Sequence, residues 1–246
     1  MTEASGHVPA SPARGTVLAA LAAVRDPELD EPVTALGFVA SCEIDGSRAE
    51  VHLRLPTYFC APNFAFLMVA DAYDAVTAVP GVDEAVIVLD DHFAAEAINA
   101  GVAARAGFAA TFEGEAIGEL DELRAGFVRK AVLAGTDRVC RAVLAAGARP
   151  DDLPAMTLGD VPEGVAPDLE RLRSRRRELG LPADRDAALL IDPDSGRPVA
   201  AGDLRLHLGK ARLSRVNIEA NTSICRGMLR HRYGAEGGCG EGKESA

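Results

Sequence analysis

The segment RAEVHLRLPTYFCAP, residues 48–62, decides how the first part of this chain folds. Its first eight residues alternate between polar and apolar side chains, which is the pattern of a half-buried β-strand. Pro62 suits the first position of a helix, and Pro80-Gly81 would end that helix near Val79. The segment therefore predicts a strand, a short loop and a helix, with Cys60 in the loop at the helix N-terminus.

This position makes Cys60 the leading candidate for a functional residue. Backbone N–H groups and the positive end of the helix dipole meet at a helix N-terminus, where they favour a thiolate over a thiol. A thiolate can bind a metal or act as a nucleophile. The alternative is a small buried residue at the end of a strand, because unmodified cysteines are often interior. Thr57, three residues earlier, could hydrogen-bond the sulfur or cap the helix.

The flanking sequence predicts further elements around this strand and helix. Ser11-Pro12 begins a helix with one apolar face, and Asp45-Gly46 joins a strand over residues 38–44 to the strand that begins at Arg48. Residues 82–89 supply a third strand, which a right-handed crossover would set parallel to the second. The order helix, strand, strand, helix, strand predicts an α+β fold, a small mixed sheet with helices on one face.

The rest of the chain is mostly helical in pattern. Apolar residues recur at helical spacing between residues 120 and 147, as one long helix or a helical pair, and again between residues 168 and 179. Residues 202–233 are compatible with either helix or strand. We therefore expect a disordered start, a two-layer domain, a mostly helical accessory domain and a disordered tail, over residues 1–11, 12–112, 113–234 and 235–246.

Composition limits the classes of function. A net charge of −11 argues against nucleic acid as a partner, because phosphate binding draws on a basic surface. The chain has neither an apolar run long enough to span a membrane nor a signal core near its start, so we expect a cytoplasmic protein with no membrane partner. The alternating arginines between residues 171 and 177 predict a solvated basic face, or alternatively a dock for an acidic client.

The remaining candidate residues carry weaker signals. Asp26 and Glu28 flank a proline and either support a site near Cys60 or only shape a turn. His52 lies on the polar face of the strand that leads to Cys60, where a solvated histidine is the more ordinary interpretation. Cys225 and Cys239 could donate further thiols, but five cysteines without a CxxC pair indicate neither a disulfide framework nor a zinc ribbon.

Taken together, these motifs resemble the PaaD/SufT-like family of metal–sulfur (iron–sulfur) cluster assembly factors. The resemblance covers roughly residues 12 to 95, and the positions that carry it are Asp26-Pro27-Glu28, Leu36-Gly37-Phe38-Val39, Thr57, Cys60, Pro62 and Pro80-Gly81-Val82. In that family the cysteine usually directly precedes the proline, whereas Ala61 intervenes here. This variant is similar to members encoded beside bacterial soluble diiron monooxygenases.

The resemblance implies a non-enzymatic maturation factor. Cys60, assisted by Thr57, would transiently hold an iron–sulfur cluster or iron, and Asp26, Glu28 and His52 would support the site or contact a partner. Because one thiol cannot complete a cluster, the cargo would be shared, for example between the protomers of a homodimer. The implied partner is a client metalloprotein, such as a monooxygenase component. The alternative is a metal-free assembly chaperone or adaptor for an oxygenase complex.

Overall fold

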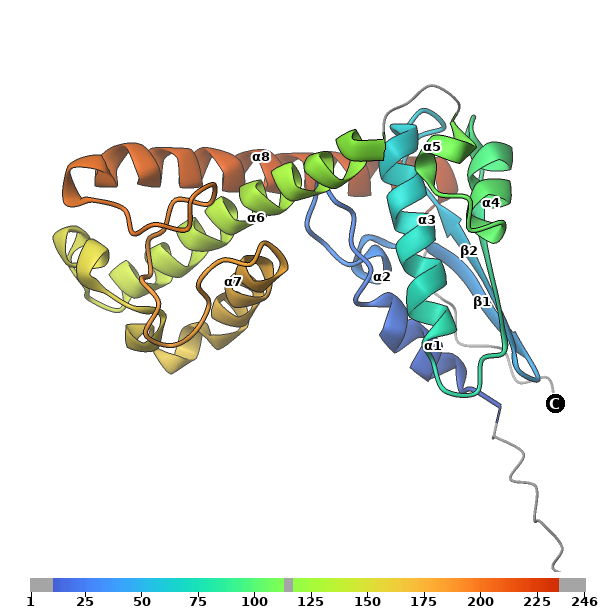
Figure 1. The fold of residues 1–246 in the computed structure, drawn as a ribbon, viewed down its shortest axis with the longest axis horizontal. Helices are drawn as coiled ribbons and strands as arrows, with labels where there is room; N and C mark the ends of the chain where they lie inside the picture. The colour runs from blue at the N-terminus through green and yellow to red at the C-terminus, as the bar shows by residue number, and fades with distance from the viewer. Residues whose placement is uncertain (1–10, 113–116, 235–246) are drawn as a thin grey trace, which may run out of the picture. The chain divides into compact units, whose positions relative to one another are not determined.

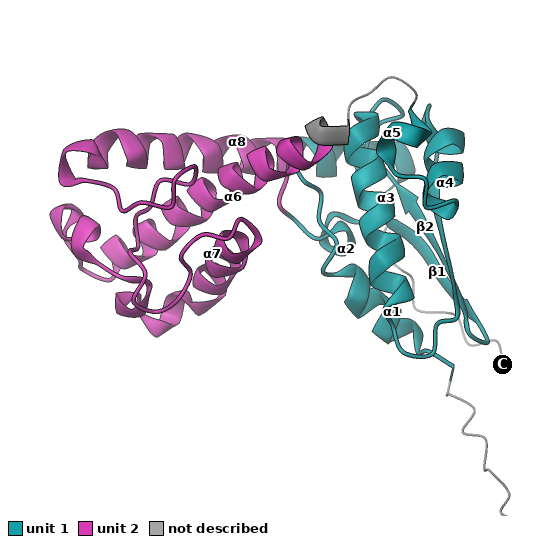
Figure 2. Cartoon of the chain, in the orientation of Figure 1, with its two compact units in different colours: residues 1–27, 31–117, 223–246 teal, residues 28–30, 118–222 magenta. Residues whose placement is uncertain are grey.

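The structure is a computed structural model that describes residues 11–112 and 117–234 (Figure 1). Two compact units make up the chain (Figure 2): unit 1 holds residues 1–27, 31–117 and 223–246, and unit 2 holds residues 28–30 and 118–222. The sequence placed residues 223–234 with the accessory region, whereas their contacts assign them to unit 1. The disorder expected at residues 1–10 and 235–246 lies outside the described residues.

Unit 1 is built on a three-stranded mixed sheet in the order β1-β2-β3. The strands are β1 (Val39–Asp45), β2 (Arg48–Arg54) and β3 (Glu84–Asp90), with β1 and β2 antiparallel and β2 and β3 parallel. The hairpin loop is Gly46-Ser47, one residue later than the sequence signal, and Gly46 takes a φ of 60° that suits glycine. The alternation in β2 is as predicted, because Ala49, Val51 and Leu53 are buried and the residues between them are partly exposed.

Helices cover one face of this sheet, which confirms the α+β fold. α1 (Arg14–Leu21) and α3 (Pro62–Thr77) lie against it side by side (Figure 1), and the other helices of the unit are α2 (Val33–Leu36), α4 (Ala95–Ala103) and α5 (Phe108–Thr111). α4 and α5 approach so closely that a Cβ added at Gly101 would lie 2.0 Å from Thr111 Oγ1. This approach explains why a glycine stands inside α4.

The outer edge of β3 is partly closed by a side chain from α4. The backbone N–H of Leu89 donates to Asn99 Oδ1 at 2.8 Å, and Asn99 Nδ2 donates to the Leu89 carbonyl at 3.2 Å. The amide group of Asn99 thus makes the pair of hydrogen bonds that a neighbouring strand would make at this position.

Unit 2 is helical. α6 (Ile117–Ala145) is a single long helix, α7 (Ala166–Glu178) follows after three short 3₁₀ turns, and α8 (Leu204–Tyr233) is also one helix, of which residues 204–222 belong to unit 2. The short turns are Pro150–Ala155, Leu158–Asp160, Glu163–Val165 and, before α8, Ala201–Asp203. The core is aliphatic, with Val132, Val139, Cys140, Leu153, Leu172, Leu189 and Leu190 among its buried members.

The arginines of α7 do not form a uniformly solvated face. Arg175 is buried and donates to Asp30 Oδ1 at 2.5 Å. Arg176 is completely buried and donates to the carbonyls of Ala188 and Leu189 at 2.9 and 2.6 Å. The prediction of a solvated face was therefore wrong for Arg175, because this guanidinium finds a carboxylate inside the fold.

Candidate functional site

Cys60 lies in the loop between β2 and α3, as predicted, with Ala61 as the N-cap residue and Pro62 at the first helical position. The residue is partly exposed. Its Sγ lies 3.2 Å from Thr57 Oγ1, a distance at which a hydroxyl and a sulfur can hydrogen-bond. The structure thus brings together the two residues that the sequence singled out for this loop.

A third residue, His92 in the loop after β3, contacts the backbone of the loop that carries Cys60. His92 is only 5% exposed, and its Nε2 lies 2.7 Å from the carbonyl oxygen of Cys60. Its Nδ1 accepts the backbone N–H of Ala94 at 3.2 Å, so the ring proton lies on Nε2 and is donated to Cys60. His92 therefore fixes the backbone of the thiol-bearing residue while both of its ring nitrogens are engaged.

The topology explains why these residues meet. β2 and β3 are parallel neighbours with Arg54 opposite Asp90, so both strands end at the same edge of the sheet. The loop after β2 carries Thr57 and Cys60, and the loop after β3 carries His92. The sequence analysis missed His92, although the parallel pairing it predicted places the residues after the two strands side by side.

Three aromatic side chains beside Cys60 form an exposed aromatic patch: Tyr58, Phe59 and Phe93. Phe59 is 77% exposed, and its ring centroid lies 5.0 Å from that of Tyr58 and 6.0 Å from that of Phe93. The backbone N–H of Phe93 donates to the Tyr58 carbonyl at 3.1 Å, which joins the two loops again. Exposed apolar patches of this kind commonly mark interaction sites.

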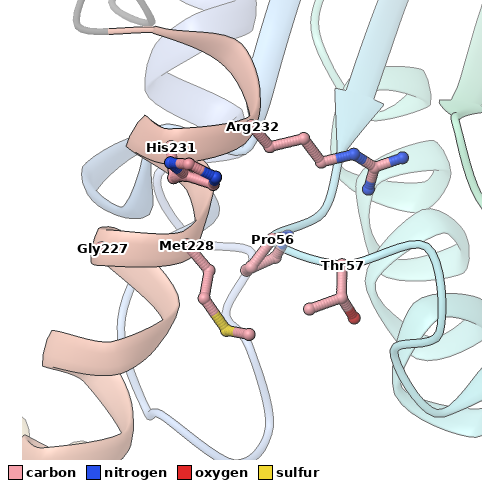
Figure 3. Close-up of a pocket in the computed structure, with 6 residues that line it drawn as sticks. All are labelled: Pro56, Thr57, Gly227, Met228, His231 and Arg232. Carbon is pink, nitrogen blue, oxygen red and sulfur yellow. The ribbon is translucent and has the colours of Figure 1, made fainter.

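A groove of about 600 Å³, which Thr57 helps to line, lies entirely within unit 1. Figure 3 shows Met228 extending from α8 toward the loop that carries Pro56 and Thr57. The remaining residues that line this groove are Gly227, His231 and Arg232. The Arg232 guanidinium donates to the carbonyls of Leu55 and Asp91, at 3.2 and 2.7 Å, which anchors the last turn of α8 to both strand ends.

His52 lies in a separate charged cluster on the polar side of β2. Its Nδ1 lies 3.1 Å from both carboxylate oxygens of Asp90, and its Nε2 lies 3.1 Å from Glu50 Oε1. Partial burial acts to lower the pKa of His52, but the hydrogen bonds to Asp90 and Glu50 outweigh it and raise the pKa. None of these hydrogen bonds reaches Cys60, and a role for His52 in supporting the site or contacting a partner stays a prediction.

The other candidate residues are placed as follows. The backbone N–H of Asp26 donates to the Glu31 carbonyl at 3.0 Å, and Glu28 accepts a hydrogen bond from Asn221 within unit 2 at 3.2 Å. Cys225 is partly exposed on α8, and Cys239 lies outside the described residues. A role for Asp26 and Glu28 beside Cys60 stays a prediction.

No group of three or more metal-ligating side chains of His, Cys, Asp or Glu is gathered anywhere in residues 11–112 and 117–234. Cys60 therefore offers a single thiol to any metal cargo, with the Thr57 hydroxyl beside it. In the same two stretches, no helix combines the length and apolarity needed to cross a membrane.

Residues 14–88 match a family model described as iron-sulfur cluster assembly protein. The matched segment runs from α1 to β3 and includes Thr57 and Cys60 but ends before His92. No curated protein and no solved structure matches the chain. This segment is thus similar to iron–sulfur cluster assembly proteins, which supports a general role in assembly.

Proposed function

We propose that the protein transiently binds an iron–sulfur cluster or iron through Cys60 and helps to install it in a client metalloprotein. The observation that carries the proposal is a partly exposed thiol, 3.2 Å from a threonine hydroxyl, inside the segment that matches iron–sulfur cluster assembly proteins. Exposure lets the sulfur reach a cargo, and the hydroxyl can hold the sulfur in place through a hydrogen bond.

Cargo held in this way must be shared. The irons of a cluster usually need four cysteine ligands in total, and this site supplies one. A second protomer can contribute its own Cys60, and a cysteine of the client can then displace a ligand during transfer. An incomplete protein ligand set therefore suits delivery better than storage.

The role is that of a carrier and not of an enzyme. A catalytic thiol needs a nearby base, but His92 donates from one ring nitrogen to the Cys60 carbonyl and accepts at the other from Ala94. A site that depends on a reduced thiol also fits the cytoplasm, where thiols are kept reduced. The client that the sequence resemblance points to is a component of a diiron monooxygenase, and unit 2 would then select that client.

The test is anaerobic reconstitution of the full chain with ferrous iron and sulfide, followed by metal counting and absorption spectroscopy. We expect the wild type to hold iron and to show sulfur-to-iron charge-transfer absorption, and Cys60→Ser to lose both. Cys225→Ser is the matched control, because this cysteine is also partly exposed in unit 1. Thr57→Val should retain the fold and bind the cargo more weakly.

Two outcomes would contradict the proposal. Full iron retention by Cys60→Ser would move the site to other thiols, of which Cys225 and Cys239 are the first to examine. A wild type that binds no iron but still promotes maturation of an oxygenase would be the metal-free adaptor instead.

A further inference from the structure

Helix α8 exposes apolar side chains on the side that faces away from the core of unit 2. Leu206, Leu213 and Val216 are 63%, 62% and 44% exposed. At 100° per residue they fall on one side of the helix, whereas the buried His207, Ala211 and Ile218 fall on a side roughly 150° away. The exposed residues therefore form a second apolar face, here named the docking stripe, that the fold of unit 2 does not use.

Basic side chains border this docking stripe on both sides. By the same helical spacing, Arg205 and Arg212 fall on one flank and Lys210 on the other, and all three are exposed. No ion pair joins any of the three to another side chain that the structure describes. Arg215, in contrast, is held by Asp137 and Glu219, each at 2.5 Å.

The charge of α8 is opposite to that of the chain. The whole chain carries −11, yet residues 204–233 hold seven lysines and arginines and a single acidic residue, Glu219. Two copies of α8 packed along their stripes would place Arg205, Lys210 and Arg212 against the same basic residues. Such like-charge pairs disfavour association, so a second copy of this chain is a poor occupant.

A membrane surface is also a poor occupant. The docking stripe has no aromatic residue of the kind that anchors amphipathic helices at the lipid interface. An acidic protein helix satisfies both features of the stripe, because its apolar residues can cover the leucines and its carboxylates can meet the flanking cations.

We propose that the docking stripe on α8 binds an amphipathic helix of a partner protein whose flanks carry Asp and Glu. The partner would present apolar side chains at helical spacing against Leu206, Leu213 and Val216, with carboxylates opposite Arg205, Lys210 and Arg212. This surface is independent of Cys60, and its occupation needs no metal.

The probe for a test is a pair of synthetic peptides of about 20 residues, the length of a stable amphipathic helix. Both carry leucine at heptad core positions, with glutamate on the flanks of one peptide and lysine on the flanks of the other. Fluorescence anisotropy with the full chain should show binding of the glutamate peptide, weakened by added salt, and at least roughly tenfold weaker binding of the lysine peptide.

Variants of α8 make the test specific. Leu213→Gln should lower the affinity for the glutamate peptide by about tenfold. The double variant Arg205→Glu, Arg212→Glu should bind the lysine peptide more tightly than the glutamate peptide. Arg185→Glu is the matched control, because it reverses an exposed charge outside α8. Circular dichroism checks that each variant keeps its helical fold, which the exposure of these residues leads us to expect.

The proposal is overturned if the two peptides bind equally well or if neither binds. It is also overturned if the protein binds vesicles containing phosphatidylglycerol more tightly than the glutamate peptide, and if Leu213→Gln abolishes this vesicle binding. Self-association in sedimentation experiments that Leu213→Gln abolishes would assign the stripe to a second copy. All of these measurements leave the iron-binding test of Cys60 unaffected, so the two proposals can fail separately.

Discussion

Replacing His92 with leucine should destabilise unit 1 by about 2 kcal/mol. The substitution removes the hydrogen bond to the Cys60 carbonyl, 2.7 Å, and the one from the Ala94 N–H, 3.2 Å. Leaving a buried backbone group without a partner costs about 1–3 kcal/mol each. Cys60 is itself partly exposed, so water can reach its carbonyl, and the lower end of the summed range, about 2 kcal/mol, applies.

The chain offers a selective assay for this change. It contains three tyrosines and no tryptophan, and Tyr58, Tyr73 and Tyr233 all belong to unit 1. Tyrosine fluorescence during urea denaturation therefore reports the unfolding of unit 1 alone. With a denaturant slope of about 1–3 kcal/mol per molar, the midpoint should fall by roughly 1 M.

Two further variants control the interpretation. His92→Gln retains an N–H donor for the Cys60 carbonyl and should recover part of the loss, whereas His231→Leu alters an exposed histidine and should change stability by less than about 0.5 kcal/mol. An unchanged midpoint in His92→Leu would refute the reasoning, because it would show that His92 does not hold the loop.

Three further predictions concern other parts of the fold. The folded pKa of His52 is raised above 6.5, so His52 adds stability that is fully present below that pH and is lost as the pH rises through the folded value. The effect should be no more than about 1 kcal/mol because the side chain is partly exposed. The measurement is the free energy of unfolding from pH 5.5 to 8.5 for wild type and His52→Gln. If the two proteins show the same dependence of this free energy on pH, the effect is excluded. Gly101→Ala gains about 1 kcal/mol of helix propensity but places a methyl group 2.0 Å from Thr111 Oγ1 unless the helices move apart. We therefore expect the free energy of unfolding, followed by tyrosine fluorescence, to fall by about 1–2 kcal/mol. A stabilised variant would contradict the close approach of α4 and α5. Burial raises the pKa of Cys140 to about 12, so native alkylation at pH 8 followed by mass spectrometry should modify Cys60 and spare Cys140 until urea is added.

Local signals predicted most of unit 1. The alternation of β2 gave the correct face, and Pro62 and Pro80-Gly81 bounded α3 to within a few residues. α8 remained ambiguous because its leucines at 204, 206 and 208 follow a strand period. The buried face of α8 instead begins with His207 and Ala211, which are weak hydrophobic signals, while Leu206 is exposed.

The site was predicted only as far as one loop. Thr57 and Cys60 are three residues apart, so local geometry could join them, whereas His92 reaches Cys60 only through the pairing of β2 with β3. The burial of Arg176 was beyond any local pattern, because the carbonyls that accept its hydrogen bonds come from residues 188 and 189.

The two hydrogen bonds between Asn99 and Leu89 affect how this sheet behaves toward other chains. An open strand edge recruits further strands, and such pairing tends to grow into aggregates. At Leu89 an incoming strand would have to displace Asn99 before it could pair with the backbone. This obstacle disfavours edge-to-edge polymerisation at that position. Side-chain contacts, which are reversible, are then the easier way for the domain to bind and dissociate from other proteins.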